Sequence, residues 1–170
     1  MKFYYTEKQL KELLTHLVVL YDQHVLDYFD KRGIKYKSKS LKTGDYSFMI
    51  EACPDLGFMR DTYFTDTLCI ERKNSIDELA GNIKERDERF FKELNRMINI
   101  PHCYLLIEGD KLDDIINHNY RSEYNELAFI RRILGVQKVS NFYLNFVQPE
   151  NIGFMIYEIC YSALMGQILK

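Results

Sequence analysis

The hydrophobic positions along the chain fall into short continuous runs separated by segments with helical spacing. Apolar runs of strand length, rich in Val, Ile, Leu, Phe and Tyr, lie at residues 17–21, 46–50, 67–70, 103–107 and 142–147. Such runs are typical of buried strands. Residues 34–41 alternate between apolar and polar positions, which predicts one further strand.

Leucines at helical spacing predict a helix over residues 6–17, which Thr6 and Gln9 would begin with a capping box. Residues 51–65 indicate only a loop or a hairpin. Further apolar stripes predict helices at about 25–32, 75–98, 111–118 and 122–134, and a last helix from Pro149 or Glu150 onward. Strands that alternate with helices point to one α/β domain over residues 1–170, with residues 1–16 as an added N-terminal helix.

The composition is that of a globular protein, and it limits the classes of function. The 170 residues are 46% hydrophobic and 28% charged, and 23 Lys and Arg against 25 Asp and Glu give a net charge of −2. This balance excludes a generally cationic, histone-like nucleic-acid binder but leaves room for a local basic patch. No apolar stretch is long enough to cross a membrane, and the N-terminus lacks the features of a signal peptide. Because no paired spacing links Cys53, Cys69, Cys103 and Cys160, we expect free thiols and a cytoplasmic protein.

A charged triplet, Glu71-Arg72-Lys73, directly continues the apolar run at 67–70. On a strand, Glu71 and Lys73 project from one face, whereas Arg72 shares the direction of the core residues before it. Charges at the end of a buried strand cost free energy unless something pairs them. Asp45 stands at the start of another predicted strand, and a neighbouring strand could set its carboxylate beside Glu71.

Two carboxylates and one lysine at the end of a sheet suit the hydrolysis of phosphodiester bonds. The carboxylates of Asp45 and Glu71 would hold Mg²⁺, a hard cation that takes oxygen ligands and keeps several waters. Lys73 would orient the attacking water or help to deprotonate it, and would offset charge on the phosphate. Taken alone, an Asp, a Glu and a Lys are weak evidence for catalysis, because a strand-end salt bridge is the commoner reason for such residues.

The order of these residues resembles a known signature. Gly44-Asp45, then 25 residues, then Glu71-Arg72-Lys73, then three residues and Asp77 is similar to the pattern of the XPF-type structure-specific nucleases, which belong to the PD-(D/E)XK superfamily. The strand end at residues 105–109 is similar as well. The resemblance covers the chain from about Val18 to the last helix. It implies a restriction-endonuclease-like α/β fold with a mixed central sheet flanked by helices.

The resemblance also implies an activity. A family member of this kind would be a metal-dependent DNA endonuclease, using Mg²⁺ or Mn²⁺, that acts on branched or flapped DNA in repair or recombination. As a small stand-alone version of the family, the chain resembles those encoded by phages and prophages. This resemblance implies a location in the cytoplasm of a bacterial or phage-infected cell. The alternative is a non-catalytic DNA-binding or scaffold subunit that keeps the nuclease-like fold.

Site roles follow from the resemblance residue by residue. Asp45 and Glu71 would be metal ligands and Lys73 the water-orienting lysine. The backbone carbonyl of Arg72 would complete the metal sphere, and its side chain would hold the site together by ion pairing. Asp77 would act as a favourable charge in the first turn of the following helix, or as part of the signature.

Arg86 matches a recurrent arginine of the family on the helix predicted at 75–98, and would contact DNA. The alternative is one of the i,i+4 ion pairs of a solvated helix face, for which Glu85 with Arg89 and Glu88 with Lys92 have the right spacing.

One departure from the family concerns the residues after the first strand. The family places an acidic residue there, followed by a variable residue and Arg-Glu, but here Gln23-His24 follows Asp22 directly. The predicted strand would also run into the next helix with almost no connection, whereas such loops usually have about 2–6 residues. We therefore expect that a stretch is missing after Asp22, and that Asp22 is a third catalytic carboxylate and metal ligand.

A basic run precedes Gly44-Asp45, since residues 31–42 contain Lys and Arg and no acidic residue. Lys35, Lys37 and Lys39 alternate and Lys42 follows, so one strand face would contact the DNA backbone; the alternative is an edge strand that lysines protect against aggregation.

Family members often carry a helix-hairpin-helix module or a helicase, for which this length leaves no room. Branched DNA would then require a homodimer, with the apolar last helix as its face or as core, or a separate targeting subunit.

Overall fold

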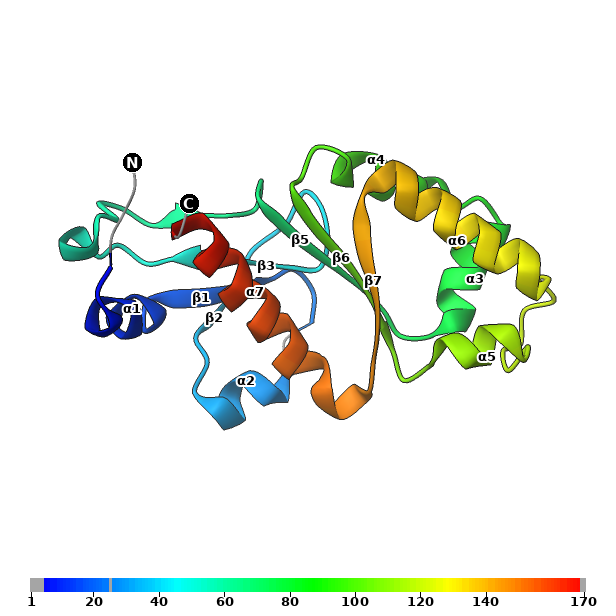
Figure 1. The fold of residues 1–170 in the computed structure, drawn as a ribbon, viewed down its shortest axis with the longest axis horizontal. Coiled ribbons are helices and arrows are strands. Elements are labelled where there is room, and N and C mark those ends of the chain that lie inside the picture. Colours follow the sequence, from blue (N-terminus) through cyan, green and yellow to red (C-terminus); the bar gives the residue numbers. More distant parts are fainter. Residues whose placement is uncertain (1–4, 25, 169–170) are drawn as a thin grey trace.

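The computed structural model describes residues 5–24 and 26–168, which form one mixed sheet with helices on both faces (Figure 1). The strands are β1 (Leu17–Tyr21), β2 (Tyr36–Ser38), β3 (Tyr46–Ile50), β4 (Thr62–Tyr63), β5 (Leu68–Lys73), β6 (His102–Glu108) and β7 (Phe142–Val147). Their order is β2-β1-β3-β5-β6-β7, and β4 pairs with β3. β3 runs antiparallel to β1, β4 and β5, whereas the pairs β1 with β2, β5 with β6 and β6 with β7 are parallel. The predicted α/β fold with a mixed central sheet is confirmed.

Seven α-helices lie before, between and after the strands of the described chain. They are α1 (Glu7–Leu14), α2 (Asp27–Arg32), α3 (Ile76–Lys84), α4 (Glu88–Met97), α5 (Leu112–Ile116), α6 (Glu126–Ser140) and α7 (Ile152–Ile168), with short 3₁₀ turns at Pro54–Leu56 and Pro149–Asn151. The predicted capping box of Thr6 and Gln9 begins α1. No helix in the described part of the chain is long and apolar enough to cross a membrane.

Two helical layers cover opposite faces of the sheet and are offset along it. α1, α2 and α7 pack over β1, β3 and β5, where Phe29, Phe48 and Ile156 are buried in one core. The chain passes from β5 to β6 to β7 by parallel crossovers in the same direction, and the common hand of such crossovers puts α3 to α6 together on the other face. There Leu79, Leu94 and Phe129 are buried in a second core, to the right in Figure 1.

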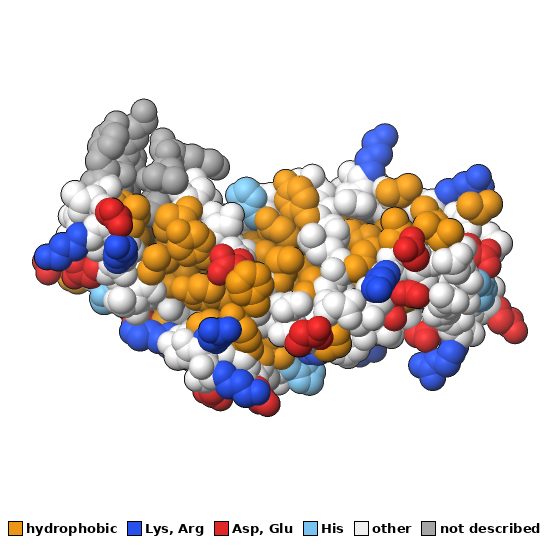
Figure 2. Space-filling model, turned by 60° about the horizontal axis from the view of Figure 1, so that its bottom comes forward, with side chains coloured by type: hydrophobic (Ala, Val, Ile, Leu, Met, Phe, Trp, Pro, Cys, Tyr) orange, Lys and Arg blue, Asp and Glu red, His pale blue; other side chains and the backbone are white. Residues whose placement is uncertain are grey.

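The offset leaves part of each face of the sheet without a helix. On the face that carries α3 to α6, the β1–β3 end has only a small cluster of Val18, Leu20 and Met49, against which Leu41 packs. On the opposite face, toward the β7 edge, the rings of Tyr104 and Tyr143 pack together with their centres 5.1 Å apart. Figure 2 shows hydrophobic side chains gathered across the middle of one face of the molecule, with charged side chains mainly around them. The sheet therefore offers two open surfaces of different character.

The predicted helix at 75–98 is wrong in one respect, because it is broken into α3 and α4. Arg86 adopts a left-handed backbone conformation with φ 52°, and the Asp87 side chain accepts hydrogen bonds from the backbone N–H groups of Arg89 and Phe90. Asp87 thus begins a new helix, which takes its own direction. The predicted pair of Glu85 with Arg89 spans this break and does not form, whereas that of Glu88 with Lys92 does, at 3.3 Å.

Other boundaries differ more modestly. The helix predicted at 122–134 begins later, because Asn125 caps it, and continues to Ser140. Only residues 36–38 of the strand predicted at 34–41 pair with β1. The segment 51–65, for which the sequence indicated only a loop or a hairpin, contributes the short strand β4.

The connection between β1 and α2 is of ordinary length. α2 begins at Asp27, so that residues 22–26 link it to β1, and Val25 lies outside the described residues. The expectation that the strand runs almost directly into the helix is wrong. The length of this connection therefore gives no reason to expect a missing stretch after Asp22.

The apolar last helix, α7, belongs to the core. Its residues Ile152, Ile156, Ile159 and Leu164 are buried against the sheet, which confirms the core alternative for this helix. All four cysteines are free, as expected, and all four are buried; Cys69 and Cys103 are direct neighbours across β5 and β6.

We expect Gly153→Ala to destabilise the protein by about 1–3 kcal/mol, because a methyl group on Gly153 would lie 2.5 Å from Cβ of Tyr28 and would push α7 away from α2. Gly166→Ala, in the same helix, meets nothing within 4 Å and should cause no loss. Urea unfolding of both variants measures the difference. Equal unfolding midpoints for the two variants would contradict this account of the α2–α7 contact.

Candidate active site

Asp45 is held against the end of β5 by its own backbone and side chain. Tyr46 pairs with Ile70 in the antiparallel ladder of β3 and β5, and the N–H of Asp45 donates to the carbonyl of Ile70 at 2.8 Å. One carboxylate oxygen of Asp45, Oδ2, accepts the N–H of Arg72 at 2.7 Å. These bonds place the carboxylate beside the strand end that carries the charged triplet.

Gly44 makes this approach sterically feasible. Its backbone is left-handed, with φ 76°, and a Cβ atom there would lie 2.6 Å from Sγ of Cys69 and 2.9 Å from the carbonyl oxygen of Ile70. No larger residue fits without moving the loop. The Gly-Asp pair of the sequence therefore has a direct structural reason.

Glu71 and Lys73 project from the same face of β5, as their spacing predicts, and meet there. Nζ of Lys73 donates to Oε1 of Glu71 at 2.9 Å and lies 3.5 Å from Oε1 of Glu78 on α3. It also lies 5.1 Å from the centre of the Phe90 ring. Only 9% of Glu71 and 8% of Lys73 are exposed to solvent, so this pair is shielded from water.

Arg72 points to the other face and pairs with Glu108 at the end of β6, the neighbouring strand. Its side chain thus ties two strand ends together, which confirms the predicted ion-pairing role. Its backbone meanwhile orients Asp45, so that Arg72 serves the site from both directions.

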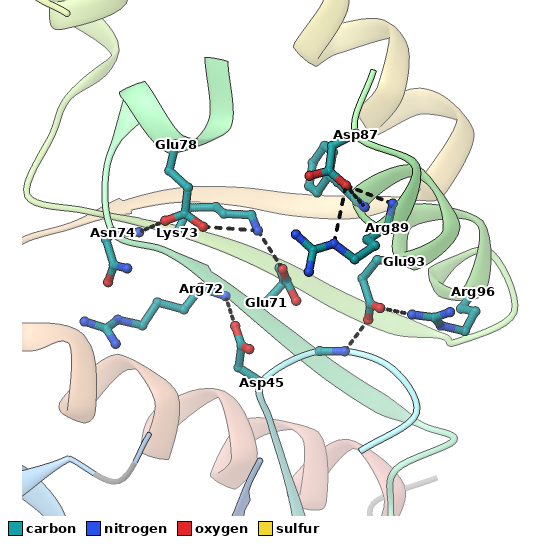
Figure 3. A network of polar contacts seen from close by, with 12 residues as sticks. Asp45, Glu71, Arg72, Lys73, Asn74, Glu78, Asp87, Arg89, Glu93 and Arg96 are labelled. Atoms are coloured by element: carbon teal, nitrogen blue, oxygen red, sulfur yellow. Dashed lines mark hydrogen bonds and ion pairs between the residues drawn. The ribbon is translucent and has the colours of Figure 1, made fainter. Parts of the chain in front are cut away.

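The side chains of Asp45, Glu71 and Lys73 line one cleft of about 420 Å³ at the end of β5 (Figure 3). Its walls come from the β1 end, the 41–45 loop, the β5 end, and helices α3 and α4. Figure 3 shows Asp45, Glu71 and Glu93 directed toward a shared space between the strands and α4. The lining residues are Asp22, Gln23, Leu41, Lys42, Gly44, Asp45, Glu71, Lys73, Glu78, Asn82, Asp87, Arg89, Phe90, Glu93 and Arg96.

Glu93 is a site residue that the sequence did not identify. Its carboxylate accepts the N–H of Gly44 and pairs with Arg96 one helical turn along α4. It therefore connects α4 to the loop that carries Asp45. The local sequence gives no signal for this role, because Glu93 looks like any solvated position of an amphipathic helix until the break at Arg86 sets the direction of α4.

The cleft holds more negative than positive charge. Burial is the main cause that raises the pKa of Glu71 to about 7, and the charges of Asp45 and Glu93 add to it while Lys73 opposes it. Burial also raises the pKa of Asp45, partly offset by the hydrogen bond from Arg72 and by the charge of Lys73. The site is thus short of positive charge when both carboxylates ionise.

Lys73 keeps its proton at neutral pH. Burial alone lowers its pKa, but the charge and hydrogen bond of Glu71, together with Glu78 and Asp45, raise the pKa above its ordinary value on balance. Lys73 is therefore an ammonium group and not a base in this arrangement.

The oxygen donors of the cleft suit a hard divalent cation. Asp45 and Glu71 offer carboxylate oxygens whose negative charge nearby cations do not fully balance. The Arg72 carbonyl is the predicted third donor. Asp22 lines the cleft, and its N–H donates to the carbonyl of Asp45 at 3.0 Å. However, among residues 5–24 and 26–168 no three His, Cys, Asp or Glu side chains come close enough to hold a metal together, so the predicted set of Asp22, Asp45 and Glu71 is not assembled. Mg²⁺ commonly takes one or two carboxylates and fills its other positions with water, so the two remaining carboxylates fit it.

Asp77 and Arg86 lie outside the cleft. The Asp77 carboxylate accepts the N–H groups of Arg121 and Ser122, at 2.8 and 3.2 Å, and pairs with the Arg121 side chain. It therefore anchors the α5–α6 connection and is structural. Arg86 is exposed in the α3–α4 turn and lines a separate hollow, while Arg89 and Arg96 line the cleft in its place.

The predicted basic strand face divides into two parts. Lys35 and Lys37 line a hollow on the helix-free side of β1, where Lys35 pairs with Glu51 at 2.6 Å. Lys39 instead lies with its Nζ 4.5 Å from the centre of the Tyr63 ring, and Lys42 lines the cleft. β2 is an edge strand, as the alternative interpretation of the lysines requires.

Comparison with known proteins points to one family. A family model described as the ERCC4 domain matches residues 18–153. The chain is similar to XPF from Aeropyrum pernix, with a TM-score of 0.61 and 17% identity over 89% of this chain and 68% of that one. It is also similar to XPF from Aeropyrum pernix in complex with DNA, with a TM-score of 0.61 and 18% identity over 88% and 66% of the two chains. At such identities the likeness concerns the fold, and this chain spans about two thirds of those chains. No curated protein matches the chain.

We expect Glu71→Gln to stabilise the metal-free protein at about pH 8. Because the pKa of Glu71 is about 7 in the folded protein and ordinarily 4.5, the folded state binds the proton more tightly, and the free energy of unfolding falls as pH rises through this range. Glutamine carries no charge at either pH and so avoids this decrease. The free energy of unfolding of Glu71→Gln should therefore exceed that of the unmodified protein by on the order of 1–3 kcal/mol at pH 8, and the two should be equal below about pH 4.

Urea unfolding in EDTA at both pH values measures this difference. The matched control is Glu88→Gln, an exposed glutamate of α4, which should show no comparable gain. If Glu71→Gln is no more stable than the control at pH 8, the ionised Glu71 side chain does not destabilise the folded protein.

Proposed function

The chain belongs to the ERCC4 domain family, which has the XPF-type nuclease fold, and we propose that it is a divalent-metal-dependent endonuclease that hydrolyses phosphodiester bonds in DNA. The observation that carries this proposal is the meeting of Asp45, Glu71 and Lys73 in one cleft at the end of the sheet. A scaffold subunit with the same fold would have no use for three charged side chains whose burial costs stability.

Asp45 and Glu71 would hold Mg²⁺ or Mn²⁺, together with the Arg72 carbonyl and water. A divalent cation at this place supplies positive charge that acidifies water and offsets charge on the phosphate. Arg72 fixes the Asp45 carboxylate through its backbone N–H and fixes the strand end through Glu108. Glu93 holds the Gly44–Asp45 loop against α4 and acts as a positioning residue.

Lys73 acts as a cation and hydrogen-bond donor. In hydrolysis, the water oxygen forms a bond to phosphorus, one ester P–O bond breaks, and the leaving sugar oxygen takes up a proton. The raised pKa of Lys73 favours orienting the water and offsetting the growing phosphate charge over deprotonating that water. Glu71 and Glu78 fix the ammonium group in the direction required.

We propose branched or flapped DNA as the substrate, in repair or recombination, in the cytoplasm of a bacterial or phage-infected cell. The resemblance of the Gly-Asp and Glu-Arg-Lys motifs to those of XPF-type nucleases supports this choice. A similar structure, that of XPF from Aeropyrum pernix, is a complex with DNA. A homodimer or a separate targeting subunit would supply recognition of the junction.

We expect Glu71→Gln and Lys73→Ala to lower cleavage of a labelled flap substrate by about 100-fold or more in Mg²⁺ or Mn²⁺, because the first removes a charged metal ligand and the second removes the cation at the reacting phosphate. EDTA should abolish cleavage by the unmodified protein. Glu88→Gln and Lys92→Ala are matched controls, since they change the same residue types in an exposed pair of α4 and should cleave normally. DNA binding without metal-dependent cleavage would instead favour the non-catalytic scaffold.

A further inference from the structure

A second hollow adjoins the active-site cleft, between the 39–43 segment, β4 and the C-terminal end of α4. We name it the side groove; it has a volume of about 650 Å³ and is lined by Lys39, Ser40, Leu41, Lys42, Thr43, Tyr63, Thr65, Asp66, Arg96, Asn99 and Ile100. Leu41, Lys42 and Arg96 line both the side groove and the cleft. A DNA strand that leaves the cleft past Lys42 would therefore enter the side groove directly.

The side groove is positively charged. Glu93 pairs with Arg96, so the free charge of the side groove comes from Lys39 and Lys42, which within the described chain form no ion pair and share the groove with one acidic residue, Asp66. The neighbouring hollow is different, because Glu51 and Asp61 balance Lys35 and Lys37 there. Free lysine charge, which attracts phosphate, is thus concentrated in the side groove.

An exposed aromatic ring stands among these lysines. Tyr63 pairs with Met49 across β3 and β4 and so projects from the same face of the sheet as the Met49 cluster. It is 41% exposed, and Nζ of Lys39 lies 4.5 Å from the centre of its ring. Cations that follow the backbone, combined with an aromatic surface for stacking, are the means by which proteins hold unpaired strands. A duplex keeps its base faces stacked and offers nothing to this ring.

We infer that the side groove binds an unpaired DNA strand that emerges from the active site, with Tyr63 stacking on a base and Lys39 and Lys42 contacting phosphates. The inference rests on the proposed function for the direction of the strand, but binding in the side groove does not depend on catalysis. It assigns a single-stranded arm as the part of the substrate that this surface recognises.

Fluorescence anisotropy in EDTA, with a 20-nucleotide oligodeoxythymidine and a duplex of equal length as probes, tests the inference without any cleavage. We expect Tyr63→Ala to weaken binding of the single strand by about 5- to 100-fold and binding of the duplex by less than twofold. Tyr63→Phe should retain single-strand binding, because the ring remains. Tyr143→Ala, which removes a 57% exposed tyrosine at the far edge of the sheet, is the matched control and should bind normally.

The lysines give an independent measurement. Lys39→Ala should weaken single-strand binding and reduce its dependence on salt concentration, whereas Lys35→Ala, whose charge Glu51 already balances, should have little effect. Equal losses for Tyr63→Ala and Tyr143→Ala, or equal losses on single strand and duplex, would overturn the inference. Selective single-strand binding without cleavage in Mg²⁺ would leave it standing and reject the nuclease proposal alone.

Discussion

The close approach of Asp45 to the end of β5 is the contact on which the site depends. The N–H of Arg72 binds the Asp45 carboxylate, which brings that carboxylate next to Glu71 in a place where little water reaches. The carboxylate of Glu71, which is buried, and that of Asp45, which is half-buried, repel each other, and Lys73 compensates only part of their charge. The hydrophobic cores on either side of the sheet must therefore stabilise an arrangement that is electrostatically unfavourable until positive charge arrives.

The offset of the helical layers determines what surrounds these carboxylates. The parallel crossovers keep α3 to α6 on one face near β5 to β7, so that α4 closes the cleft with Glu93 and Phe90. The same face of the sheet stays open beyond the 41–45 loop, and there Lys42 and Tyr63 are exposed and Lys39 is half-buried in the side groove. One topological feature thus gives a walled cleft and an open approach to it.

Much of the site could be predicted because it depends on local periodicity. Alternation along a strand placed Glu71 and Lys73 together and Arg72 opposite, and the family-like motif brought Asp45 to them. Glu93 could not be found this way, because its contact depends on the helix break at Arg86 and on the fold around the 41–45 loop. The different surroundings of Lys35 and Lys39 could not be predicted for a similar reason. Both belong to the same alternating run, but Lys35 pairs with Glu51, a residue distant in sequence, and Lys39 does not.

The position of β5 has a consequence for the dynamics of the molecule. It lies where the two helical layers overlap, with α7 on one side and α3 on the other, and it is paired along its length with β6. Its local opening therefore requires the disruption of both cores, so that the free energy of opening approaches that of global unfolding. The segment that carries Glu71 and Lys73 is thus among the last parts of the protein to fluctuate, and the geometry of its charges is retained for as long as the fold itself.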